Sequence, residues 1–304
     1  MAIRIARKRR MMKISHGFEY AAVRLLTKFV QILPGRLADR VAVLLGRAAY
    51  YILTSRRRIA RHNLYRAFGD ELSPDKIERI VREVFINISR TTIEFARQPV
   101  LTPEKILEMV SANEGRHYFD KVLAEGKGAM LITGHFGNWE LMGGWVAAMG
   151  YPLDFLVGQQ HNRNVDELFI SFRRALGVGI IPIGVAARKV IKSLRANRMV
   201  AVVSDQHAAS GGAIINFFNR RASTPKGPAA FAVKVGCPIL FGCSIREGYN
   251  KHRVEIDPPI YPPQSGDTEQ DILTMTQKYG KYLEARIRKY PDQWMWTHRR
   301  WKVD

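Results

Sequence analysis

The first part of the chain contains two stretches in which polar residues recur at helical spacing among apolar ones. Residues 18–33 are largely apolar, and Arg24, Lys28 and Gln31 recur among them at spacings of four and three. Such spacing places the polar side chains on one stripe of a helix. Residues 36–53 repeat the pattern after a Pro-Gly break, with arginines on one stripe and leucine, valine and tyrosine opposite. The pattern predicts two basic amphipathic helices.

From about residue 125 the pattern changes to short β-rich runs that alternate with helical periods. The runs expected to form strands are 128–133, 153–158, 179–183, 199–204, 238–245 and 252–257. The segments expected to form helices are 73–98, 138–149, 165–176, 185–196, 226–235 and 268–289. Alternation of this kind predicts an α/β fold with a largely parallel central sheet flanked by helices.

The chain shows no internal repeat and no low-complexity linker. We expect residues 1–68 to form a basic amphipathic segment that associates with a membrane, and residues 69–304 to form the catalytic domain. A helix begins just after this boundary, because Ser73 is a favourable N-cap and Pro74 suits a first helical turn.

The net charge of +21 is concentrated at the start of the chain. Residues 1–68 contain 16 lysines and arginines against only Glu19 and Asp39, which gives +14. A spanning helix needs about 20 apolar residues with almost no charge, whereas a basic face opposite an apolar face suits a helix in the interface of an anionic membrane. We therefore expect this segment to lie on an anionic membrane surface, with a weak single pass as the alternative.

The cysteine content indicates a reducing compartment. Cys237 and Cys243 are too few for a disulfide framework. The basic start of the chain is not followed by an uninterrupted apolar core and a small-residue cleavage site, so no secretory signal is evident. We expect both thiols to be reduced.

The stretch "MLITGHFGNWE" places a histidine directly after a predicted strand. His135 then lies at the carboxyl edge of the sheet, where open α/β sheets bind ligands. Glu140 falls in the first turn of the following helix, from which a carboxylate can orient the imidazole as a general base. An ordinary polar contact is the simpler alternative, since the helix dipole alone favours an acid there. No serine or cysteine nucleophile is near in the sequence, so the attacking hydroxyl is expected to come from the substrate.

A second group of polar residues precedes the helix predicted at 226–235. Hydroxyl, guanidinium and ammonium groups at a helix N-terminus suit a phosphate or a carbonyl oxygen. A capped helix after a basic loop is the alternative, but capping does not require the added charge. The residues expected in this anion site are Arg220, Arg221, Ser223, Thr224 and Lys226.

The sequence does not predict a metal site or a nucleotide-phosphate loop. His135, Glu140, His161, Asp205 and His207 could supply ligands, but they lack the close spacing of a zinc-protease motif. No glycine-rich loop ends in Gly-Lys-Ser or Gly-Lys-Thr. We expect neither a metal nor a bound cofactor.

The C-terminal stretch "YPDQWMWTHRRWK" mixes aromatic and basic residues. Such a mixture can stack on bases or lie at the boundary of lipid headgroups. It also suits a final strand with one buried face, and the sequence leaves these alternatives open.

Four separated blocks, "GHFGNWE", "SDQ", "FFNRRASTPKGPAAFAVKVGCPIL" and "WMWTHRRWK", resemble the late acyltransferases of lipid A biosynthesis in the same order. The resemblance implies a fold of the glycerophosphate acyltransferase type at the cytoplasmic face of the bacterial inner membrane. It implies transfer of a fatty acyl chain to the hydroxyl of a hydroxyacyl chain on a phosphorylated glucosamine disaccharide, in lipopolysaccharide biosynthesis. The implied donor is a thioester of acyl carrier protein, with coenzyme A as the alternative.

The resemblance also assigns residues. His135 and Glu140 match the family pattern of a histidine followed by an acid after four residues, as general base and orienting group. Asp205 and Gln206 match a polar pair at the end of a later strand, and Arg220 lies in the block after the paired phenylalanines. Backbone amides near residues 134–137 or 220–227 are expected to stabilise the tetrahedral oxyanion.

Two departures from the family pattern concern the acceptor. Many members have an arginine shortly after the strand at 153–158, where Arg163 is the candidate here, and His207 stands where an aspartate is common. Another glycolipid or lysophospholipid acceptor, such as a phosphatidylinositol mannoside, is therefore the first alternative.

A basic nucleic-acid-binding protein is the second alternative, because a pI near 10.3 and aromatic residues among arginines are typical of that class. The apolar faces of the N-terminal helices argue against it, since a phosphate backbone has no use for them. We expect no nucleic-acid partner.

Overall fold

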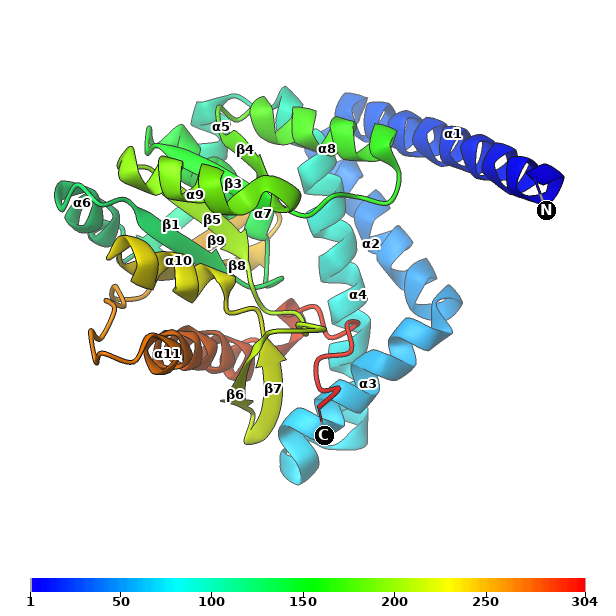
Figure 1. The fold of residues 1–304 in the computed structure, drawn as a ribbon. Coiled ribbons are helices and arrows are strands. Elements are labelled where there is room, and N and C mark those ends of the chain that lie inside the picture. The colour runs from blue at the N-terminus through cyan, green and yellow to red at the C-terminus, as the bar shows by residue number, and fades with distance from the viewer. Residues whose placement is uncertain (1, 304) are drawn as a thin grey trace.

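Seven strands form the central sheet of the protein (Figure 1). The computed structural model describes the backbone of residues 2–303 and the side chains of residues 16–184 and 187–303. The strand order is β1-β9-β8-β2-β5-β3-β4. All neighbouring strands are parallel except β8 and β9, which pair antiparallel. The predicted α/β fold with a largely parallel sheet is therefore confirmed.

The bounds of the strands follow the β-rich runs of the sequence closely. The seven strands of the sheet are β1 (Val110–Glu114), β2 (Ala129–Thr133), β3 (Leu153–Val157), β4 (Gly179–Pro182), β5 (Met199–Val203), β8 (Ile239–Gly248) and β9 (Lys251–Ile256). All of the predicted strands are present, and β1 is an addition that the sequence did not indicate. Its side chains are mostly exposed, so it lacks an apolar pattern.

Helices cover both faces of the sheet. Alternate residues of β2 point to opposite faces, as the strand geometry requires. Ala129 and Leu131 pack with α5 (Pro103–Glu108), α6 (His117–Ala124) and α7 (Trp139–Ala148). Met130 and Ile132 belong to the larger cluster on the other face, which includes α9 (Ala186–Arg195), α10 (Gly227–Val235) and α11 (Thr268–Lys289). The sheet is thus the middle layer of three.

An antiparallel hairpin lies outside the main sheet. It consists of β6 (Ala213–Phe217) and β7 (Arg220–Thr224). Phe218 and Asn219 form its two-residue turn, both with φ near +55°. Positive φ at both central positions is typical of a type I′ hairpin turn. The sequence analysis treated 220–224 as a loop before a helix, which is wrong, because these residues form a strand.

The first four α-helices are α1 (Ala2–Ile32), α2 (Gly35–Ile52), α3 (Thr54–Phe68) and α4 (Pro74–Arg97). Figure 1 shows α1 extending away from the body while α2 and α3 follow α4. In the described part of the chain, none of the helices combines the length and apolar character required to cross a bilayer. Both α2 and α3, which lie before the predicted domain boundary at residue 68, pack against α4, which lies after it. The domain boundary at that residue stays a prediction.

Close packing of α2 on α4 depends on Gly46. A Cβ at this position would lie 2.6 Å from the Cα of Ile86 and 2.9 Å from the carbonyl oxygen of Phe85. Both atoms belong to backbone, so neither can give way easily. Substituting Gly46→Val should therefore lower the free energy of unfolding by about 2 kcal/mol. Denaturant unfolding in detergent measures this change.

A glycine of α1 provides the control. No atom lies within 4 Å of a Cβ built at Gly17. Gly17→Ala should raise the unfolding free energy by up to about 1 kcal/mol, because alanine restricts the unfolded chain and favours helix. An unchanged midpoint for Gly46→Val would contradict the close approach of α2 to α4.

Candidate active site

The site is centred on the ring of His135, which follows β2 after a single glycine. Its Nδ1 lies 2.7 Å from Oδ1 of Asp205, and its backbone N–H donates to Oδ2 of the same carboxylate at 2.8 Å. Asp205 follows β5, which pairs in parallel with β2, so both residues leave the sheet at the same edge. The register of these two strands therefore brings the imidazole and the carboxylate together.

Trp294 supplies a third hydrogen bond to this carboxylate, through Nε1 at 2.7 Å from Oδ2 of Asp205. Burial raises the pKa of Asp205, but the charge of His135 and these hydrogen bonds outweigh burial and hold the pKa below its usual range. Burial lowers the pKa of His135, while the charge and hydrogen bond of Asp205 raise it, with a net rise. The pair is therefore an orienting carboxylate and a base of increased basicity.

Glu140 does not occupy the orienting position that the sequence analysis gave it. It lies in the first turn of α7, and its carboxylate accepts from Nε and Nη2 of Arg173 at 3.1 and 2.5 Å. Arg173 belongs to α8 (Arg163–Arg174). The first turn of α7 faces α8, whereas Nδ1 of His135 faces the neighbouring strand. Direct orientation of the ring by Glu140 is thus wrong, although its charge still raises the pKa of His135.

The turn after His135 is supported from α4 and β8. Oδ1 of Asn138 accepts a hydrogen bond from the N–H of Leu141 and so caps α7. Nδ2 of Asn138 donates to Oε2 of Glu94 at 2.5 Å. Glu94 forms a buried pair with Arg246, whose Nη2 lies 2.8 Å from Oε2. Gly137 has φ of +55°, and a Cβ there would lie 1.7 Å from a backbone oxygen of β8. This support fixes the course of the turn.

The backbone amides of the turn are already engaged. The N–H groups of residues 135–138 donate to Asp205 and to the carbonyls of Gly134, Gln293 and Ser244. The expectation that this turn supplies oxyanion donors is therefore wrong for these four groups. Gln206 lines the adjoining cavity and carries a side-chain amide. It is the candidate donor that the structure offers in place of the turn.

A cavity of about 490 Å³ opens beside His135. Its polar lining includes Glu140, Arg173 and Gln206. The apolar part of the lining consists of Phe95, Trp139, Leu156, Val157, Phe169, Ile183, Val202 and Val203. A largely apolar cavity with a few convergent polar groups is typical of a site for a lipid or another small molecule.

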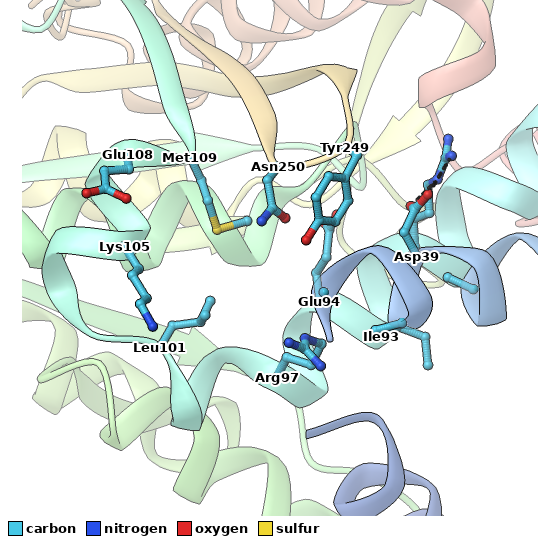
Figure 2. A pocket seen from close by; sticks show the side chains of 14 residues that line it. Asp39, Ile93, Glu94, Arg97, Leu101, Lys105, Glu108, Met109, Tyr249 and Asn250 are labelled. Atoms are coloured by element: carbon cyan, nitrogen blue, oxygen red, sulfur yellow. Dashed lines mark hydrogen bonds and ion pairs between the residues drawn. The ribbon is translucent and has the colours of Figure 1, made fainter. Parts of the chain in front are cut away.

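A second cavity of about 490 Å³ lies against another face of α4 (Figure 2). Figure 2 shows Arg97, Lys105 and Tyr249 around it. The buried pair partner Glu94 is also part of its lining, so one residue of α4 contributes both to this cavity and to the support of the catalytic turn. No pattern in the sequence predicts this cavity.

The residues expected in an anion site do not gather at the N-terminus of α10. Lys226 is the N-cap residue of that helix and pairs with Glu269 at 2.8 Å. The side chains of Ser223 and Thr224 are buried in β7, where the Thr224 hydroxyl accepts from Arg300. Because 220–224 is a strand, successive side chains point to opposite sides instead of towards one ligand.

The three predicted arginines lie at the surface. Arg220 donates from Nε to the carbonyl of Arg66 at 2.8 Å, and Arg221 is exposed. Arg163 begins α8 and pairs with Glu167 at 3.0 Å, with 84% of its side chain exposed. None of the three lines the cavity at His135 among the residues described there. His161 and His207 are not part of a metal cluster within the described residues.

Sequence reasoning missed the partners that come from distant segments. In the sequence, Arg173 belongs to a predicted amphipathic helix and Trp294 to a run of aromatic residues. Nothing in their spacing relates either residue to His135. The buried pair of Glu94 and Arg246 was also not foreseen. An unpaired charge on an otherwise apolar helix or strand is the signal that could have indicated it.

The pKa of His135 provides a test of this geometry. In an Asp205→Asn variant the negative charge is removed while burial remains, so the pKa of His135 should fall below its usual value. Titration of the ring by NMR measures the shift. An Asp70→Asn variant removes the same charge from an exposed position and should leave the His135 titration unchanged. A His135 pKa that does not fall in Asp205→Asn would contradict the pairing.

Comparison with known proteins relates this site to a family. Residues 6–303 match the family described as bacterial lipid A biosynthesis acyltransferase. A phosphatidylinositol mannoside acyltransferase of Mycolicibacterium smegmatis is 23% identical over 250 residues, which cover 80% of this chain and 79% of that one. The lipid A biosynthesis palmitoleoyltransferase of Escherichia coli K12 is 25% identical over 265 residues, 85% of this chain and 83% of that one.

A solved structure is also similar. The 1-acyl-sn-glycerophosphate acyltransferase PlsC of Thermotoga maritima aligns with a TM-score of 0.39 and 12% identity, over 86% of this chain and 99% of that one. The family match extends over almost the whole length, and the relatives are named as acyltransferases. The chain therefore belongs to the bacterial lipid A biosynthesis acyltransferase family and is an O-acyltransferase.

Proposed function

We propose that this protein transfers a fatty acyl chain from a thioester to the hydroxyl of a hydroxyacyl chain on a phosphorylated glucosamine disaccharide lipid. The observation that carries the proposal is the His135–Asp205 pair beside an apolar cavity without a protein nucleophile. In the described lining, the hydroxyls are those of Thr91 and Thr92, and both donate to backbone carbonyls. The attacking hydroxyl therefore comes from the acceptor.

The geometry supports a direct transfer. With Nδ1 held by Asp205, Nε2 of His135 is left to accept the proton of the acceptor hydroxyl. The hydroxyl oxygen attacks the thioester carbonyl, and the resulting tetrahedral intermediate breaks the carbon–sulfur bond. The departing thiolate takes the proton from the imidazolium. We infer that the amide of Gln206, which lines the same cavity, donates to the oxyanion, and the apolar wall suits the acyl chain.

Glu140 supports this chemistry indirectly. It holds the Arg173 guanidinium at the cavity wall in a buried pair. Removal of either partner leaves a buried charge without compensation, which is strongly unfavourable. We propose that Glu140 maintains the shape and charge of the cavity and that Asp205 orients the base.

The choice of acceptor rests on the relatives. They are named for lipid A and for phosphatidylinositol mannosides, and both names denote a phosphorylated glycolipid. The family description favours the lipid A precursor, and a phosphatidylinositol mannoside remains the alternative. Acyl carrier protein is the proposed donor, with coenzyme A as the alternative.

A direct assay tests the proposal. Purified protein is supplied with each thioester donor and with either a lipid A precursor or a phosphatidylinositol mannoside, and the products are identified by mass. We expect the mass of one acyl chain to be added to the lipid A precursor. His135→Ala should abolish the transfer, because the carboxylate in the described lining, Glu140, is paired with Arg173. Full activity of His135→Ala would contradict the mechanism.

We further propose that α1 and α2 bind the anionic cytoplasmic face of the inner membrane. Large apolar side chains are exposed along both helices, including Phe18, Leu25, Phe29, Ile32, Leu44 and Ile52. Cationic residues lie between them, a combination that suits an interfacial helix. Nucleic acid is disfavoured as the partner, because it would leave these apolar groups in water.

Membrane binding has its own test. Phe29→Asp combined with Ile32→Asp should reduce flotation with vesicles of anionic lipid by about tenfold or more, because two exposed apolar anchors are replaced by like charges. The His135→Ala protein, unchanged on these helices, should float as the unaltered protein does. Undiminished flotation of the double variant would exclude α1 as the membrane-binding element.

A further inference from the structure

The C-terminal residues 294–302 end beside α3 (Figure 1, red segment), and they contact the catalytic histidine. The N–H of Met295 donates to the carbonyl of His135 at 2.9 Å. Asn63 of α3 then donates to the carbonyls of Trp296 and His298 at 2.7 and 2.6 Å. Helix α3 therefore contacts this segment next to the site.

Two further segments, β7 and the residues that follow β5, contact α3 and the C-terminal segment. Arg220, the first residue of β7, donates to the carbonyl of Arg66 on α3, and Arg66 donates to the carbonyl of Trp301 at 3.2 Å. The backbone N–H of His207 lies 3.4 Å from Nε2 of His298. Residues that are far apart in the sequence thus form one continuous surface beside His135. We call the part formed by α3, Arg220 to Lys226 and residues 298–302 the C-terminal basic surface.

This surface carries an excess of positive charge, although Glu269 pairs with Lys226 and Glu78 pairs with Arg61 of α3. Residues 54–68, 206–226 and 293–303 contain no aspartate and no glutamate. Exposed side chains on these segments include Arg56, Arg58, Arg220, Arg221, Arg299 and Lys302. Within the described side chains, no ion pair joins any of these six to a carboxylate. Their charge is therefore available to a ligand.

The positive charges of Arg300 and Lys302 act on two histidines, His207 and His298. Burial lowers the pKa of His207, and the charges of Lys302 and Arg300 lower it further. Burial also lowers the pKa of His298, which feels the charges of both Asp205 and His135. His298 therefore lies between the basic surface and the catalytic pair.

We propose that the C-terminal basic surface binds a phosphate group of the acceptor lipid while the acceptor hydroxyl lies at His135. The inference rests on the proposed function, because it assumes a phosphorylated acceptor. Guanidinium groups match phosphate in charge and hydrogen-bond geometry. The binding of a charged group distant from the reacting atoms also orients the hydroxyl for proton transfer.

The surface suits a headgroup better than the bilayer itself. The large apolar side chains that are exposed on the N-terminal helices lie mainly within residues 18–53, before α3. Within residues 54–68, 206–226 and 293–303, the exposed large apolar residues described are Tyr65, Ile214 and Val303, of which Tyr65 belongs to the basic surface. A surface that carries positive charge but exposes little apolar area favours a phosphorylated headgroup over the hydrocarbon of a bilayer.

Neutralisation of two exposed cations tests the proposal. Arg299→Gln combined with Lys302→Gln removes two charges, and neither side chain makes a hydrogen bond to the protein within the described contacts. Transfer is measured in neutral detergent micelles, with a lipid A precursor and with the same lipid after phosphatase treatment. We expect the KM for the phosphorylated lipid to rise about tenfold with kcat nearly unchanged. The KM of the double variant for the dephosphorylated lipid should equal that of the unaltered protein.

A matched control removes the same charge elsewhere. Lys192→Gln combined with Arg195→Gln alters exposed residues at the end of α9, which leads into the amino end of β5 and so to the opposite edge of the sheet. This control should leave both KM values unchanged. Equal effects of the two double variants would overturn the proposal, because they would indicate a general response to net charge.

Other outcomes identify a different occupant. An effect that occurs only on anionic vesicles would mean that the surface binds the bilayer, and a raised KM for acyl carrier protein alone would mean that it binds the donor. Either result overturns the proposal. Equilibrium binding of the phosphorylated lipid without an acyl donor separates this proposal from the proposed function. If the protein binds the phosphorylated lipid, the double variant does not, and neither transfers an acyl chain, the proposed phosphate-binding surface is supported and the proposed acyl transfer is refuted.

Discussion

The buried carboxylate of Asp205 is the interaction on which the site depends. It accepts from the ring of His135, from the backbone of the same residue and from Trp294. These donors come from the end of β2 and from the C-terminal segment, while the carboxylate itself comes from the end of β5. Burial of an ionised carboxylate is costly unless it is fully hydrogen-bonded, so the folded state requires all of these segments to meet at one point.

A second buried ion pair performs a similar task behind the first. Glu94 and Arg246 join α4 to β8, and Asn138 connects this pair to the start of α7. The catalytic turn is thus held from the sheet by Asp205 and from the helical layer by Glu94. A base held from two sides loses little freedom when the substrate binds, which favours the transfer.

The sequence predicted the elements of the fold well, because short apolar runs and helical periods are local signals. It also located His135, since a strand followed by glycine places the next residue at the edge of the sheet. It could not identify Asp205 as the partner of the ring, because that requires the adjacency of β2 and β5. Glu140 was preferred because it is near in sequence, whereas its partner Arg173 lies on a separate helix.

The hairpin shows the limit of local signals most clearly. The basic residues of 220–224 resembled a loop before a helix, and only Phe218 and Asn219, with their positive φ, indicate the turn of a hairpin. Residues of the C-terminal segment raised a similar difficulty. Its tryptophans and Arg300 are buried, while Arg299 and Lys302 lie at the surface. The expected final strand is wrong, because Trp294 forms only an isolated bridge with Phe136 within the described backbone, and contact with lipid headgroups or bases stays a prediction.

The three donors on Asp205 have a consequence for how such a protein can change over evolutionary time. Any single replacement among His135, Asp205 and Trp294 removes at least one hydrogen bond from a buried group, so it lowers stability as well as activity. Sequence change at the reacting centre must therefore be concerted and slow. The exposed cations near α3 carry no such penalty, because each can be exchanged without disturbing the interior. A lineage can thus acquire a new acceptor by drift at its surface while it inherits the reaction unchanged.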